Sequence, residues 1–302
     1  MVTAVAALET GTVGVADKIN DNGPYYGITT GTTKPPACWY FNDYGRGHGW
    51  LNVSEAIQKS CNYFFFDVST KMGIDNLNRY AKYFGLGTKT GIEIPGEKKG
   101  VLAGREAAEA TNNVWSAAQT AYASIGQGLN SFTPVQMAKY IAMVANGGNK
   151  LDISIVKSVN LSNGTQVAET EIDEFVNKKL GLEADNTEDL KISETTINAV
   201  KEGMRSVTEV VGGTAYSVFK DFTISVGGKT GSAEAGRRTD GWFAGFAPYD
   251  DPEIAVVVMV ENGKHGYYTA EVVKEIIYEY FGMNVQSVVE NMSASYETES
   301  FR

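Results

Sequence analysis

Helical spacing of apolar positions dominates the first two thirds of the chain. Residues 1–10 are apolar on most sides, which predicts a helix buried at the centre of a domain and capped by Gly11. Residues 17–49 show no sustained period and are expected to be loop-like. Capping residues followed by helical periodicity predict further helices over 52–59, 63–72, 74–84, 135–146 and 194–211.

Strand-like patterns appear later in the chain. Residues 151–167 alternate and contain Asn163-Gly164, a strong hairpin signal. A closing helix is expected after three strands, and the turn between the last two strands favours an antiparallel pair. These elements cover 223–234, 241–247, 253–261 and 267–281. A helical block followed by an antiparallel sheet predicts an α+β domain over 1–286, with a polar tail over 287–302.

Charge and composition exclude several classes of function. The 302 residues include 26 Lys and Arg against 36 Asp and Glu, a net charge of −10 that disfavours nucleic acid as a partner. The longest apolar run, Ile254–Val260, is far shorter than the roughly 20 residues of a membrane helix. Two cysteines allow at most one disulfide, so the sequence leaves the redox compartment undecided.

Lys229-Thr230-Gly231-Ser232 lies within a predicted strand behind two glycines. Such a tetrad offers a cation, two hydroxyl groups and an open backbone edge to a carboxylate ligand. Taken alone, it is more typical of a surface lysine in a glycine-rich strand.

Two further elements also have a plain structural interpretation. Ser60-Cys61-Asn62 falls in a break between two predicted helices, where a hydroxyl and an amide can relay a proton and hold a substrate amide. Ser and Asn are equally common as helix caps. Gly126-Gln127-Gly128 suggests a close approach of two backbones, but alone it indicates only a loop.

The order of these elements resembles the active-site set of penicillin-binding proteins and serine β-lactamases. The sequence over 47–96, 124–148 and 227–263 is similar to the transpeptidase domain of class B, elongation-type penicillin-binding proteins. The resemblance runs from Met1 to about Phe281. It implies the penicillin-binding protein/serine β-lactamase-like α+β fold, an antiparallel sheet with flanking helices and an all-helical subdomain.

Members of this family cross-link peptidoglycan without a cofactor. A serine attacks the D-Ala-D-Ala bond of a stem peptide, and β-lactams trap the acyl-enzyme. By motif, Ser60 would shuttle a proton toward the leaving amine, Asn62 would hold the substrate amide, and Lys229 would set the local potential. The Ser232 N–H would supply half of an oxyanion hole. The substrate or antibiotic carboxylate would bind to Thr230, Gly231 and Ser232.

The resemblance also implies a nucleophile that this sequence lacks. In relatives, a Ser-x-x-Lys motif directly precedes a sequence similar to Met1–Glu9. The serine and the lysine of the motif would therefore lie just before Met1. The motif is also matched by Ser154–Lys157 and Ser217–Lys220, but both matches follow Ser60 and so have the wrong order. Both also lie in segments predicted to be strand or loop, where the serine and the lysine would not share a helical face. This chain is therefore expected to form no covalent acyl-enzyme.

The sequence is compatible with two explanations of the missing motif. The chain is either part of a longer membrane-anchored protein or a natural pseudoenzyme that senses β-lactams or muropeptides without turnover. A serine β-lactamase is the other enzyme alternative, although no residue is assignable to its deacylation step. The resemblance places the parent protein on the outer face of the bacterial cytoplasmic membrane, in a cell-wall synthesis complex with a glycosyltransferase.

The early region holds four potential metal ligands, Asp17, Cys38, Asp43 and His48. Their spacings match no zinc template, so the sequence predicts no metal site. Cys61 is expected to be a buried small side chain, because no electropositive neighbour that would activate its thiol is evident.

Overall fold

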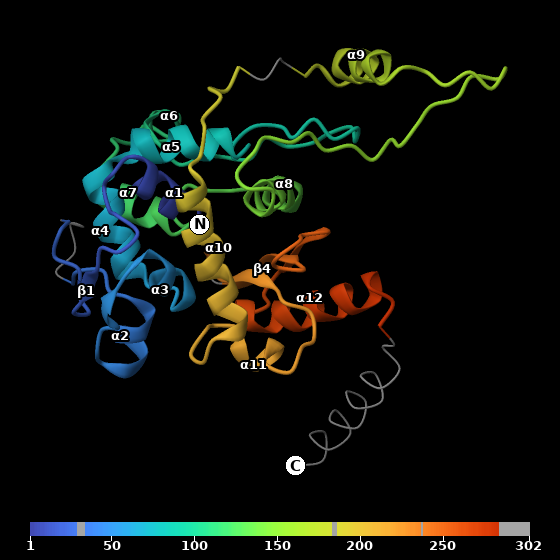
Figure 1. The fold of residues 1–302 in the computed structure, drawn as a ribbon. Helices are drawn as coiled ribbons and strands as arrows, with labels where there is room; N and C mark the ends of the chain where they lie inside the picture. Colours follow the sequence, from blue (N-terminus) through green and yellow to red (C-terminus); the bar gives the residue numbers. More distant parts are fainter. Residues whose placement is uncertain (29–33, 183–185, 237, 284–302) are drawn as a thin grey trace.

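Figure 1 shows the computed structural model, which describes residues 1–28, 34–182, 186–236 and 238–283. The predicted polar tail over 287–302 lies outside these residues. Within the described part of the chain, no helix has both the length and the apolar character needed to cross a membrane. A helical part, blue to green in Figure 1, lies beside a sheet with its own helices, orange to red.

Helix α1 (Val2–Glu9) lies at the centre of the helical part, as predicted. Its residues Thr3–Ala7 are buried, because the helix is apolar on most sides and other helices surround it. The helices that contact it include α4 (Asn62–Met72), α5 (Ile74–Tyr83) and α10 (Glu194–Glu209).

Capping residues determine where several other helices begin. Helix α3 (Val53–Gln58) starts at a capping box formed by Asn52 and Glu55, and α8 (Pro134–Ala145) starts at a capping box formed by Thr133 and Gln136. The sequence reading missed several helices, of which three are only four to six residues long. These missed helices are α2 (Trp39–Tyr44), α6 (Arg105–Glu109), α7 (Ala117–Ser124), α9 (Glu169–Leu180) and α11 (Tyr216–Phe219).

The main sheet is antiparallel, in the order β3 (Gly227–Ala235), β4 (Arg238–Ala247) and β5 (Ile254–Val260). Gly241 of β4 faces α12 (Gly266–Tyr280), whereas Lys201 of α10 lies over the Phe246 ring at 5.3 Å. Successive strand residues point to opposite faces, so α12 and α10 cover opposite sides of the sheet. This arrangement confirms the predicted α+β fold.

A second, small sheet lies in the region predicted to be loop-like. It pairs β1 (Ile19–Asp21) with β2 (Gly49–Leu51), and Asp21 lies opposite Gly49. Strands of three residues are too short to show a period in the sequence, which explains why the prediction missed them.

The predicted strands over 151–167 are not formed. The Asn163-Gly164 turn is present, and the Thr165 N–H donates to Asn163 Oδ1 at 2.9 Å. Beyond the turn, an isolated bridge joins Asn160 to Gln166 and two backbone hydrogen bonds flank it, but no strand is formed. Most of this segment is exposed on an arm that extends from the domain (Figure 1). A strand pair with no face to bury is marginal in water, so the alternating pattern alone does not order it.

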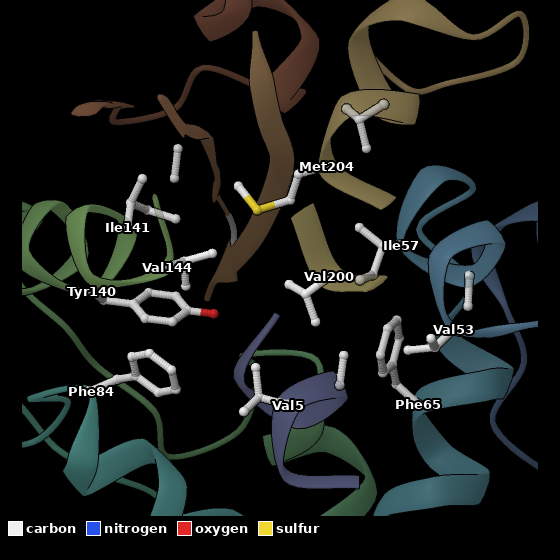
Figure 2. Packing of buried hydrophobic residues seen from close by; sticks show 14 of the residues in the cluster. Val5, Val53, Ile57, Phe65, Phe84, Tyr140, Ile141, Val144, Val200 and Met204 are labelled. Atoms are coloured by element: carbon white, nitrogen blue, oxygen red, sulfur yellow. The ribbon is translucent and has the colours of Figure 1, made fainter. Parts of the chain in front are cut away.

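A shared core joins the helical part to the sheet. Val5 of α1, Ile57 of α3 and Met204 of α10 are at most 1% exposed and lie close together in Figure 2. Helix α10 contacts α3 and α1 as well as β3. The segments that carry Ser60 and Lys229 are therefore held by one packed core.

Candidate active site

Ser60 lies in a tight break between α3 and α4. The break forms because the Ser60 N–H donates to Ile57 O at 3.1 Å and the Cys61 N–H donates to Ala56 O at 2.9 Å. Ser60 adopts φ +52°, a left-handed conformation that costs a serine about 1 to 3 kcal/mol. The Trp39 indole N–H donates to Ser60 O at 3.0 Å and holds this backbone in place.

Lys229 of β3 reaches Ser60 from the sheet. Its Nζ donates to Ser60 Oγ at 2.8 Å and to Thr230 O at 2.7 Å. The preceding Gly228 allows β3 to lie against the Phe243 ring, because a Cβ there would come within 2.2 Å of that ring. The structure thus joins two residues of the sequence-predicted site directly.

Burial sets the proton affinity of this amine. Desolvation lowers the pKa of Lys229 from 10.5 to about 8. The α-amino group of Met1 is also buried here, and desolvation together with the Lys229 charge lowers its pKa to about 5. An amine with a pKa near neutrality can accept and return a proton, so Lys229 is suited to proton transfer through Ser60.

Replacing the buried amine (Lys229→Met) is expected to raise the free energy of unfolding, by up to about 3 kcal/mol below pH 8. The folded pKa is about 8 and the unfolded value is 10.5, so between them the unfolded chain binds more protons and the unsubstituted fold gains stability as pH rises. The advantage of the variant should shrink over this window. Denaturant unfolding at several pH values measures it. Lys71→Met on exposed α4 surface is the control, and a pH-independent difference for Lys229→Met would contradict the assignment.

Hydroxyl groups continue the site along β3. Thr230 Oγ1 lies 2.7 Å from Thr214 Oγ1, in the loop before α11. Ser232 Oγ accepts the N–H of Gly266, the first residue of α12, at 3.2 Å. Gln127 Nε2 donates to Ser232 O at 3.4 Å, so the Gly126-Gln127-Gly128 loop meets the tetrad strand.

Asn62 begins α4 two residues after Ser60. Its backbone N–H donates to Cys38 Sγ at 3.3 Å, which ties the start of the helix to the segment that precedes α2. Thr214 and Gly266 are the site residues that sequence reasoning missed. The two glycines before Thr214 are typical of the end of a helix. This pattern gave no indication that Thr214 belongs to a site.

The two rejected Ser-x-x-Lys matches lie away from this arrangement. Ser154 donates its hydroxyl to Glu93 on an exposed segment. Ser217 lies on helix α11, so its predicted placement in strand or loop text is wrong. Lys220 is half exposed and lies 3.9 Å from the Asp221 carboxylate, and neither match changes the assignment of Ser60 and Lys229.

Four metal-ligating side chains meet next to Ser60, and we call them the thiol cluster: Asp21, Cys38, His48 and Cys61. One ligand atom from each lies within 4.8 Å of all the others. Two sulfurs, one imidazole nitrogen and one carboxylate oxygen are a donor set that suits tetrahedral Zn²⁺.

The sequence named only part of this cluster. Cys38 and His48 are in it, whereas Asp17 accepts the Gly14 N–H and Asp43 is exposed. Asp21 and Cys61 complete the set from other elements of the fold. The four ligands therefore show no short spacing in the sequence that would predict the cluster. Contrary to the absence predicted from spacing, these residues can hold a metal ion.

The surroundings shift the pKa values of the two thiols in opposite directions. A hydrogen bond from Cys61, with further help from His48, lowers the pKa of Cys38 to about 5. Burial and the charge of Cys38 raise the pKa of Cys61. Burial alone would lower the pKa of His48, but hydrogen bonds with Asp21 and Cys38 raise it to about 9. Cys61 is fully buried, as predicted, and His48 is the positive neighbour that the sequence did not reveal.

A family model described as "Penicillin binding protein transpeptidase domain" matches residues 1–281. The chain belongs to this transpeptidase family. It is 30% identical to the peptidoglycan D,D-transpeptidase MrdA of Acinetobacter baumannii over 282 residues, covering 90% of this chain and 40% of that protein. It is 32% identical to the stage V sporulation protein D of Bacillus subtilis over 236 residues, covering 75% of this chain and 32% of that protein.

Solved structures agree with this assignment of the transpeptidase domain. Pseudomonas aeruginosa PBP2 superposes with a TM-score of 0.78 at 29% identity, over 92% of this chain and 59% of that chain. The D,D-transpeptidase domain of an Eggerthella lenta peptidoglycan glycosyltransferase gives 0.69 at 26% identity, over 94% and 64%. The fold predicted from the motifs is thereby confirmed, while the chain spans less than half of the curated relatives' length.

Proposed function

We propose that this transpeptidase domain binds peptidoglycan stem peptides ending in D-Ala-D-Ala, and β-lactams, at Ser60 and along β3. The observation that carries the proposal is the 2.8 Å hydrogen bond from Lys229 Nζ to Ser60 Oγ. It joins the hydroxyl between two helices to the strand that carries Thr230 and Ser232.

Each residue then has a role in peptide cross-linking. Ser60 passes a proton toward the leaving D-Ala amine, and the amine of Lys229 supplies and recovers that proton. Asn62 holds the substrate amide. The Thr230 and Ser232 hydroxyls bind the terminal carboxylate beside Gly231, and the Ser232 N–H stabilises the oxyanion.

The nucleophile in this scheme belongs to a Ser-x-x-Lys motif that the 302 residues do not contain in the required order. The chain by itself therefore binds its ligands non-covalently. The MrdA relatives are named peptidoglycan D,D-transpeptidases, which favours cross-linking over β-lactam hydrolysis as the activity of the whole protein.

A similar structure supports a proposal for the setting of the whole protein. One similar structure, at 28% identity, is described as a peptidoglycan synthase complex that coordinates polymerization and crosslinking. We extend this to a membrane-anchored parent that works outside the cytoplasmic membrane with a glycosyltransferase.

The binding of a stem pentapeptide ending in D-Ala-D-Ala tests the proposal by calorimetry or NMR. Thr230→Val removes a hydroxyl that would donate to the ligand carboxylate, so affinity should fall roughly 10- to 100-fold. Thr223→Val, on an exposed residue before β3, is the matched control. Equal affinity for a peptide ending in L-Ala-L-Ala would contradict the proposal.

A further inference from the structure

Helix α9 is amphipathic, but none of its residues is buried. Four apolar side chains recur at helical spacing and share one face of the helix: Ile172, Phe175, Val176 and Leu180. Phe175 is 62% exposed, and the Lys179 ammonium lies over its ring at 5.6 Å. Figure 1 shows α9 on the arm, away from the other helices and the sheet. The described part of the chain therefore leaves this apolar face largely uncovered.

The local sequence favours a helix at this place. Glu169 and Glu171 lie in the first turn and Lys178 and Lys179 in the last, so the charges at both ends complement the helix dipole. Gly181 ends the helix in the left-handed conformation. A lone helix of about 12 residues is nevertheless marginal in water, because most helical stability comes from packing of the apolar face. A second surface is therefore needed to cover α9.

We propose that α9 pairs with α9 of a second copy of this chain, as two antiparallel helices related by a two-fold axis. Antiparallel pairing places the N-terminal half of one helix against the C-terminal half of the other. The acidic residues of α9 lie in its N-terminal half and the two lysines in its C-terminal half, so two copies are complementary in charge. The pairing involves neither Ser60 nor Lys229 and does not rest on the proposed function.

One register of the two helices satisfies both the apolar face and the charges. With Ile172 of each helix opposite Val176 of the other, the two Phe175 rings meet near the two-fold axis. Glu171 and Lys178 are seven residues apart, so they lie about two turns apart on the same edge of the apolar face. In this register, Glu171 comes beside Lys178 of the second copy, and the symmetry makes that ion pair twice.

The charge and length of α9 restrict what covers it. Helices that lie on membranes are rich in Lys and Arg on the polar face, whereas α9 has four acidic residues and two lysines. A helix of 12 residues is about 18 Å long, so the paired helices form a contact smaller than a standard stable interface. The expected dimer is therefore weak, with a dissociation constant of about micromolar or weaker.

Sedimentation equilibrium of the 302-residue chain tests the dimer over roughly 1 µM to 1 mM protein. The average mass should rise from that of the monomer toward that of the dimer. Phe175→Asp should abolish this rise, because it places a charge at the two-fold axis. Val114→Asp, at a residue that is 91% exposed outside α9, is the matched control and should leave the rise unchanged. A monomer at every concentration, or equal association of the Phe175→Asp chain, would overturn the proposal.

Charge reversal tests the antiparallel arrangement. Glu171→Lys or Lys178→Glu alone places like charges together twice in the dimer, so the dissociation constant should rise at least roughly tenfold. The two changes combined restore both ion pairs and should bring the constant back to within a few fold of the original. Glu174→Lys, on the opposite side of the helix, should change it little. A double variant as weak as the single variants, or single variants without effect, would overturn the register.

Flotation with phosphatidylglycerol vesicles tests a lipid surface as the alternative cover for α9. The chain is expected to remain unbound, because its acidic helix is repelled by the anionic lipid. Binding that Phe175→Asp abolishes would assign the apolar face to a membrane and overturn the dimer.

Discussion

A fluorescent penicillin should label the chain covalently once Ser-x-x-Lys is placed directly before Met1, whereas the 302-residue chain should take no label. Four added residues continue α1 backwards by about one turn, and the added serine and lysine then share one helical face. The Met1 amino group is buried beside Lys229, so the added motif enters next to Ser60 and the tetrad strand. We expect a change from no label to stoichiometric label, read from a denaturing gel and intact mass.

The control for this experiment changes only the added nucleophile. An extended chain with Ala-x-x-Lys should fold equally well by circular dichroism and remain unlabelled. A folded Ser-x-x-Lys chain that takes no label would contradict the placement of the site, and so would label on Ser60, Ser154 or Ser217 of the unextended chain.

Gly266→Ala should strongly destabilise the sheet. A Cβ at this position would lie 2.3 Å from Gly231 O and 2.6 Å from Trp242 O, and both are backbone atoms of the sheet. Neither neighbour can turn aside, so α12 must move away from β3. Such overpacking costs about 1 to 3 kcal/mol or more. Denaturant unfolding should show this loss, accompanied by weaker stem-peptide binding, because the Gly266 N–H to Ser232 Oγ hydrogen bond is lost.

A substitution on the outer side of the same helix separates this effect from helix propensity. Tyr268 is 56% exposed, so Tyr268→Ala should change the free energy of unfolding by less than about 0.5 kcal/mol. If Gly266→Ala proves equally mild, the close approach of α12 to β3 does not determine the geometry of Ser232.

Local signals predicted most of the fold. The apolar character of residues 1–10 predicted a central helix, and Asn52 and Thr133 predicted helix starts that the structure confirms. The failures lie where burial and local pattern disagree. Residues 151–167 alternate like a strand but have little to pack against, and β1 is too short to show a period.

Motif order predicted the tetrad and Ser60, and their contact is now visible in the structure. The thiol cluster and Thr214 were not predictable in the same way. Asp21, Cys38, His48 and Cys61 are brought together by the pairing of β1 with β2 and by the starts of α2 and α4. Contacts of this kind exist only after the chain has folded, so residue spacing carries no record of them.

Helix α10 holds the two parts of the candidate site together. It contacts α3, which leads into Ser60, and β3, which carries Lys229, although 169 positions separate these two residues. The break that carries Ser60 and the strand that carries Lys229 thus depend on one helix and one continuous core. Each of them is expected to stay folded only while the other is folded, so neither half of the chain should fold as a domain on its own. Most of the 151–167 arm is exposed and lies outside this core, so we expect that it can change in length without separating Ser60 from Lys229.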